Sequence, residues 1–177
     1  MFSTALRRRL SEIARGNFAL PRGLPENTSA AHYALEFQFS GKEARNRLGT
    51  FFVCSYRTSE IIPEAASIAE RVCSLSEVRG HHHSRLLFVD LETCGLANAP
   101  VFLVGTMRTV GMDFEIHQYF ARDYSEEPSL LLRARELTDE VDGFVTFNGR
   151  SFDVPYLRDR MVFHKLEFVP PRVHFDM

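Results

Sequence analysis

The sequence has no tryptophan, no marked excess of one charge sign and no apolar run long enough to cross a bilayer. A net charge of −2 over 177 residues gives no global basic field that would announce a nucleic-acid partner. Such a partner is not excluded, because an enzyme that meets phosphate through bound metal needs only a local positive groove. The longest apolar runs, 86–89 and 100–105, fall far short of the roughly 20 residues that a spanning helix needs. We therefore predict no membrane association.

Cysteine is also scarce. The three cysteines, Cys54, Cys73 and Cys94, are odd in number, far apart and form no C-x-x-C pair. This pattern argues against a disulfide framework or a zinc ribbon and favours a reducing compartment. The arginines at 7–9 are not followed by an apolar core and a small-residue cleavage site, so no secretory signal is indicated. A cytoplasmic location with no disulfide partner is the prediction, and no pattern indicates an oligomeric state.

What is present is the composition of a soluble globular protein, 45% hydrophobic and 25% charged. We expect an N-terminal appendage over residues 1–83 and a main domain over residues 84–177. The appendage is predicted to contain a helix at 3–15, a Gly/Pro-rich linker, strands at 33–39 and 48–57 joined by a turn at Ser40-Gly41, and a short helix at 63–72.

In the main domain, three strand-like segments come first, at 85–92, 100–110 and 113–121. A helix at 125–141, a strand at 144–148, a helix at 153–164 and the beginning of a strand at 172–177 follow. Three meandering strands and a helical crossover into a strand parallel to the first form the order of a ribonuclease-H-like fold. The predicted fold class is α/β, a mixed sheet flanked by helices.

Acidic residues stand at the ends of two of these strands. Asp90 and Glu92 close the most apolar strand, and because strand side chains alternate, both carboxylates face one side while Leu91 faces the other. Burying two acids there is costly without a cation, and oxygen ligands favour Mg²⁺ or Mn²⁺. Asp153 begins the helix after "VTFN". Taken alone it fits an ordinary helix N-cap, but if its strand lies beside that of Asp90, all three carboxylates meet at one sheet edge.

The segments "FVDLETCGL", "VTFNGRSFDVPYL" and "HFDM" resemble the DEDD (DnaQ-like) 3′–5′ exonuclease superfamily, and most closely its YprB-like branch, over residues 46–177. The resemblance implies that Asp90, Glu92 and Asp153 are catalytic and hold two Mg²⁺ or Mn²⁺ ions. It implies as substrate the 3′ end of single-stranded DNA or RNA, without a preference between them. The residues implied in nucleic-acid binding are Thr93, Gly95, Leu96, Asn148 and Arg150.

One family feature has no counterpart. The fourth acid, preceded by a His or Tyr on a later helix, is missing before Met177, and Asp176 belongs to the strand segment and is not assigned to that role. We therefore expect a domain truncated at its C-terminus, although completion of the site by a partner chain or loss of activity would account for the same absence. The leading prediction is a 3′–5′ exonuclease. The alternatives are a catalytically incomplete nucleic-acid-binding module and an endonuclease of ribonuclease H type.

Overall fold

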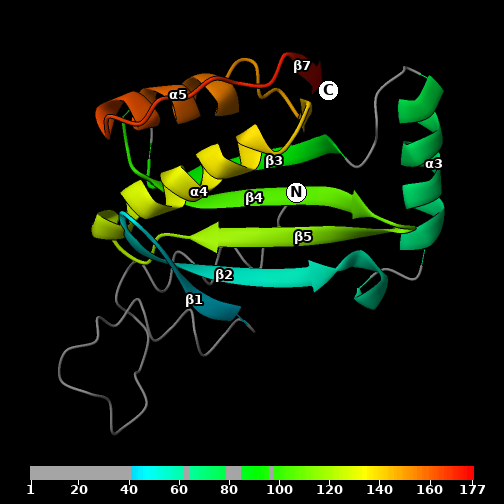
Figure 1. Cartoon of the computed structure of the whole chain (residues 1–177), viewed down its shortest axis with the longest axis horizontal. Helices are drawn as coiled ribbons and strands as arrows, with labels where there is room; N and C mark the ends of the chain where they lie inside the picture. Colours follow the sequence, from blue (N-terminus) through cyan, green and yellow to red (C-terminus); the bar gives the residue numbers. More distant parts are fainter. Residues whose placement is uncertain (1–40, 62–63, 79–84, 96–97) are drawn as a thin grey trace, which may run out of the picture. The chain divides into compact units, whose positions relative to one another are not determined.

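The computed structural model describes residues 41–61, 64–78, 85–95 and 98–177. The predicted helix at 3–15, the linker, the strand at 33–39 and Leu96 lie outside these residues. The described strands form one seven-stranded sheet in the order β1-β2-β5-β4-β3-β6-β7 (Figure 1). The predicted α/β class with a mixed sheet is confirmed.

The elements from β2 onward follow the predicted segments, except that α3 begins two residues later and ends six residues later than predicted. The strands are β1 (Gly41–Asn46), β2 (Gly49–Arg57), β3 (Leu86–Thr93), β4 (Val101–Val110), β5 (Asp113–Phe120), β6 (Gly143–Thr146) and β7 (Val173–Asp176). The helices are α3 (Ala65–Val78), α4 (Glu127–Asp139) and α5 (Asp153–Phe163), with 3-10 turns η1 (Thr58–Glu60) and η3 (Tyr124–Glu126).

The strand pairing has the order expected for a ribonuclease-H-like fold. β3, β4 and β5 form an antiparallel meander, and β6 returns beside β3 in parallel, with Phe88 opposite Val145. β7 then pairs in parallel with β6. The prediction that the strand after the helical crossover runs parallel to the first strand is confirmed. This pairing brings the carboxyl ends of β3, β6 and β7 to the same edge of the sheet.

On the other side of the meander, β2 pairs antiparallel with β5, from Phe52 opposite Phe120 to Arg57 opposite Glu115. β1 follows at the edge and was not predicted, because its charged sequence "GKEARN" has the composition of a turn and loop. Lysine and charge are typical of exposed edge strands. By its contacts the chain divides into residues 1–41 and 42–177. The predicted boundary between 83 and 84 stays a prediction, although β2, which precedes it, belongs to the same sheet as β3.

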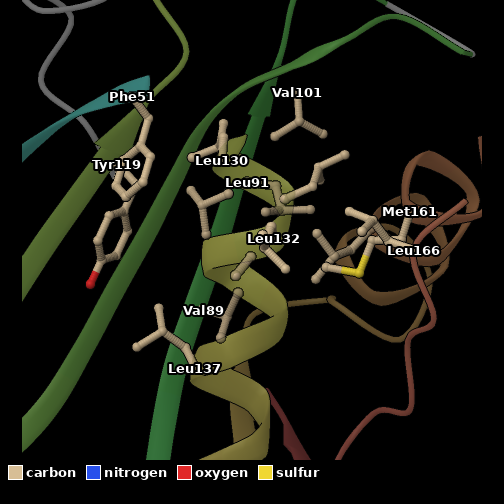
Figure 2. Close-up of a cluster of buried hydrophobic side chains, with 14 of the residues drawn as sticks. Phe51, Val89, Leu91, Val101, Tyr119, Leu130, Leu132, Leu137, Met161 and Leu166 are labelled. Atoms are coloured by element: carbon tan, nitrogen blue, oxygen red, sulfur yellow. The ribbon is translucent and has the colours of Figure 1, made fainter. Parts of the chain in front are cut away.

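One face of the sheet is packed by α4 and α5. Leu130, Leu132 and Leu137 of α4 lie over Val89 and Leu91 of β3 (Figure 2). Met161 and Leu166 close the same cluster from α5 and the segment after it (Figure 2). Full burial of each such side chain contributes about 1.5–3 kcal/mol. Because Leu91 is committed to this core, the side chains of its neighbours along β3 must face the opposite side.

In the part of the chain that the structure describes, no helix is both long and apolar enough to cross a membrane. Cys54 and Cys94 are free thiols, the first buried and the second exposed.

Candidate functional site

The end of β3 presents two acidic side chains next to a buried one. Leu91 is 4% exposed and belongs to the core, whereas Asp90 is exposed and Glu92 is partly buried. The pairing with β4 shifts register between Glu92 and Thr93. Such irregularities bend a strand and often re-aim side chains beside functional sites. The predicted alternation along this strand is confirmed.

Asp153 is the first residue of α5, and its side chain reaches β3. Its Oδ1 accepts a hydrogen bond of 2.9 Å from the backbone N–H of Leu91. The N-cap position of α5 belongs to Phe152, and no side chain caps the helix. The N-cap interpretation of Asp153 is therefore wrong. The carboxyl group instead contacts the backbone amide that lies between Asp90 and Glu92 in sequence.

The electrostatic environment of Asp153 disfavours its negative charge. The residue is 6% exposed, and burial is the main cause that raises the pKa of its carboxyl group to about 6. The negative charges of Asp90 and Asp176 also raise this pKa, while the Leu91 amide lowers it. A buried carboxyl facing other carboxylates is an environment that a bound cation would relieve.

The donor chemistry at this edge fits a hard divalent cation such as Mg²⁺ or Mn²⁺, because the candidate ligands are carboxylate oxygens. Among the described residues, however, no group of three or more His, Cys, Asp and Glu side chains is arranged to hold a metal ion. Asp153 of α5 thus contacts the end of β3 that bears Asp90 and Glu92, but the three carboxylates are not arranged as a set of metal ligands in this structure. The role of Asp90, Glu92 and Asp153 as metal ligands remains a prediction.

The loop between β6 and α5 carries two of the predicted nucleic-acid-binding residues. Asn148 adopts a left-handed conformation with φ 59°, and its N–H donates to the carbonyl of Met177. Arg150 is exposed, and its Nη2 donates to the carbonyl of His174 at 2.9 Å. The structure therefore places Asn148 and Arg150 at the same edge as Asp153, held by the end of β7.

The turn after β3 carries the other predicted contacts. The hydroxyl of Thr93 donates to the carbonyl of Gly95 at 2.7 Å, which closes a tight turn. Gly95 is exposed, and among the described residues a Cβ added there would meet Ala99 at an ordinary 3.7 Å. These two residues lie close together, and Leu96 lies outside the described residues.

Reasoning from the sequence missed the residues that hold this edge in place. Asp176 accepts hydrogen bonds from the Thr146 hydroxyl and the Gly149 N–H, both at 2.7 Å, and from the Arg150 N–H at 3.2 Å. The Thr146 hydrogen bond is the main cause that lowers the pKa of Asp176. A signal existed, since Thr146 and Asp176 each end a short apolar strand and Gly149 follows a turn-forming Asn.

Reasoning from the sequence also missed a group of residues around Glu127, which contacts the segment between β3 and β4. Glu127 is 1% exposed and accepts from the Val101 N–H at 2.9 Å and from Arg160 Nε at 2.8 Å. His164 Nε2 lies 2.8 Å from the same carboxylate. Arg160 also donates to the carbonyl of Asn98. In the sequence, Glu127 is an acid in the first turn of a helix, which is an ordinary position for it. The available signal was the spacing of Arg160 and His164 by four residues, which places both side chains on one face of a helix.

Comparisons with known proteins agree with this architecture. A family model described as RNase_H superfamily matches residues 87–177, just over half of the chain. The protein YprB of Bacillus subtilis, itself described as uncharacterized, is 30% identical over 106 residues. That alignment covers 56% of this chain and 25% of YprB, so the chain spans about a quarter of that relative's length.

Proposed function

The chain belongs to the RNase_H superfamily, and from this premise we propose that it is a metal-dependent nuclease domain of the 3′–5′ exonuclease type. In this proposal it hydrolyses phosphodiester bonds of single-stranded DNA or RNA, beginning at the 3′ end. The observation that carries the proposal is the hydrogen bond from the Leu91 N–H to Asp153. It brings a carboxyl group from the β6–α5 segment to the strand end that bears Asp90 and Glu92.

Three carboxylates from two distant segments suit the binding of two Mg²⁺ or Mn²⁺ ions. When bound, these ions would supply activation of water and stabilisation of the charge that develops on the phosphate. Asp90, Glu92 and Asp153 would hold them. The raised pKa of Asp153, about 6, supports this role. Ionisation of this carboxyl group is unfavourable without a cation, and a nearby cation would stabilise its charged form.

The remaining predicted residues would bind and orient the substrate. Arg150 is exposed on the β6–α5 loop, where its guanidinium group can approach a phosphate. Asn148 would orient the site from the same loop. Thr93, Gly95 and Leu96 would contact the terminal nucleotide from the turn after β3. This division leaves metal binding to the carboxylates and substrate positioning to the two loops.

The proposal is tested with oligonucleotides labelled at the 5′ end, as single-stranded DNA and as RNA, in Mn²⁺ or Mg²⁺. We expect a ladder of products shortened from the 3′ end, blocked by chelation and reduced at least a thousandfold in Asp90→Ala, which corresponds to about 4 kcal/mol. Asp159→Ala, on the exposed side of α5, is the matched control and should cleave normally.

Other outcomes separate the competing functions. Internal cuts in a hybrid duplex would indicate an endonuclease of ribonuclease H type. Binding that weakens steeply with salt, together with no cleavage in either metal, would contradict the nuclease and indicate a nucleic-acid-binding module.

A further inference from the structure

Asp176 lies at the end of β7, directly beside the loop that leads to Asp153. In the parallel register of β6 and β7 it is opposite Thr146. Its Oδ1 accepts from the Thr146 hydroxyl and from the Gly149 N–H, and its Oδ2 accepts from the Arg150 N–H. One carboxylate thus receives one hydroxyl and two consecutive backbone amides of the β6–α5 loop.

The backbone around this carboxylate reinforces the same contact. The Met177 N–H donates to the Thr146 carbonyl at 2.9 Å, and the Asn148 N–H donates to the Met177 carbonyl at 3.1 Å. Arg150 Nη2 donates to the carbonyl of His174. The loop is therefore attached to β7 on both sides of Asp176.

A continuous set of contacts leads from Asp176 to the candidate site. Gly149, whose N–H donates to Asp176, accepts with its carbonyl the N–H of Val154 at 2.9 Å. Val154 follows Asp153 in the first turn of α5, and Asp153 accepts the Leu91 N–H. The placement of the Asp153 carboxyl on β3 thus depends on where the loop is held.

Gly149 shows how little room this arrangement has. A Cβ added there would lie 2.5 Å from the Cβ and Oγ1 of Thr146, closer than real Cβ contacts come. The Gly149 backbone therefore packs directly against Thr146, whose hydroxyl donates to the same Asp176 carboxylate. The close approach of Gly149 to Thr146 and the hydrogen bonds to Asp176 thus hold the loop at the same place.

We infer that Asp176 is a positioning residue, which holds the β6–α5 loop so that Asp153 stays against the Leu91 amide, and not a ligand of the candidate metal centre. Its two oxygens already accept three hydrogen bonds, one from the Thr146 hydroxyl at the end of β6 and two from amides of the loop. The inference rests on the proposed function for its catalytic consequence, but the placement of Asp153 can be measured without any catalysis.

Two substitutions of Asp176 should weaken the attachment of the β6–α5 loop to different degrees. Asp176→Asn retains a carbonyl oxygen for Thr146 and Gly149 but turns an amide donor toward the Arg150 N–H. Asp176→Ala removes both acceptor oxygens and with them all three hydrogen bonds. Asp159→Asn and Asp159→Ala make the same changes of charge and size at an exposed position of α5 and are the matched controls.

The first measurement is the Leu91 amide resonance in ¹⁵N-labelled, metal-free protein. We expect this amide to lose its downfield shift and its protection from hydrogen exchange in Asp176→Ala, with an intermediate change in Asp176→Asn and none in the Asp159 variants. An unchanged Leu91 amide in Asp176→Ala would overturn the inference. Should Asp176→Ala not fold, Asp176→Asn and Thr146→Val, which removes one donor to Asp176, decide the question in its place.

The second measurement separates turnover from substrate binding. Misplacement by about 1 Å can lower a rate about a hundredfold, so we expect kcat of Asp176→Ala to fall by about that factor. KM should rise by a smaller factor, because Arg150 lies on the same loop. A kcat equal to that of the Asp159 controls would contradict the inference. If the unsubstituted protein does not cleave, the proposed function fails, while the Leu91 amide still tests the placement of Asp153.

Discussion

The N–H of Leu91 donates a hydrogen bond to Asp153 across 62 residues of sequence. Leu91 buries its side chain under α4, so its backbone is rigidly held and its amide is available at the sheet edge. Burial of Asp153, together with the negative charges of Asp90 and Asp176, makes ionisation of its carboxyl group costly. The carboxyl group of Asp153 is thus held in place by a hydrogen bond, in an environment that disfavours its ionisation.

The pH dependence of stability should reveal this conflict. The carboxyl of Asp153 has a folded-state pKa of about 6, above its ordinary 3.8. Between these values the folded state binds the proton more tightly than the unfolded state, so this group lowers the free energy of unfolding as pH rises from about 4 to about 6. Asp153→Asn removes this dependence. Relative to the unsubstituted protein, the variant should gain up to roughly 3 kcal/mol between pH 4 and pH 7 in chelator.

Urea unfolding of both proteins at pH 4.5, 5.5 and 7 measures this difference. A difference between the two proteins that stays constant over this range would contradict the prediction, whatever its size at a single pH. Asp159→Asn, exposed on α5, serves as the control and should follow the unsubstituted protein at each pH.

Divalent cations should restore the stability that ionisation of Asp153 removes at neutral pH. An ion that binds only the folded state adds about 2.7 kcal/mol at a concentration one hundred times its Kd. For a chain of this size that corresponds to a rise of roughly 5–10 °C in Tm. We expect Mn²⁺ to raise the Tm of the unsubstituted protein and of Asp159→Asn, but not of Asp90→Asn or Asp153→Asn. Equal Tm values with Mn²⁺ and with chelator would count against a metal centre here.

Gly149 should tolerate no side chain. Gly149→Ala places a Cβ 2.5 Å from Thr146, and overpacking of this kind costs about 1–3 kcal/mol. Gly95→Ala is a fair comparison, because its Cβ would meet Ala99 at an ordinary 3.7 Å. Denaturant midpoints should fall clearly in the first variant and little in the second. Similar midpoints in the two variants would show that the loop can move away from Thr146.

Glu127 should matter more to stability than its neighbours on α4. Glu127→Ala leaves the buried Arg160 without its carboxylate, and breaking a buried pair in this way costs about 3–5 kcal/mol. Glu136→Ala removes a half-exposed partner of Arg133 on the same helix and should cost at most about 1 kcal/mol. Thermal unfolding of the two variants measures the contrast, and a loss of equal size in both would refute it.

The sequence by itself was sufficient for the main elements of the sheet and for the acids of β3. Apolar runs of strand length and a stripe of leucines at helical spacing report burial directly, since each depends on neighbours within a few residues. For the same reason Asp90 and Glu92 could be assigned to one face, with Leu91 in the core. The edge strand β1 was not predicted because "GKEARN" has little apolar content.

Only the tertiary structure decided what Asp153 contacts. An acid that begins a helix looks locally like an N-cap, and nothing near it in sequence reveals the Leu91 amide, 62 residues away. The same holds for Asp176 and Glu127, whose partners come from other strands and helices. Local patterns determine which residues are buried, because burial follows periodicity. Which polar groups meet is determined by the order and register of the strands, which the chain establishes only when it folds.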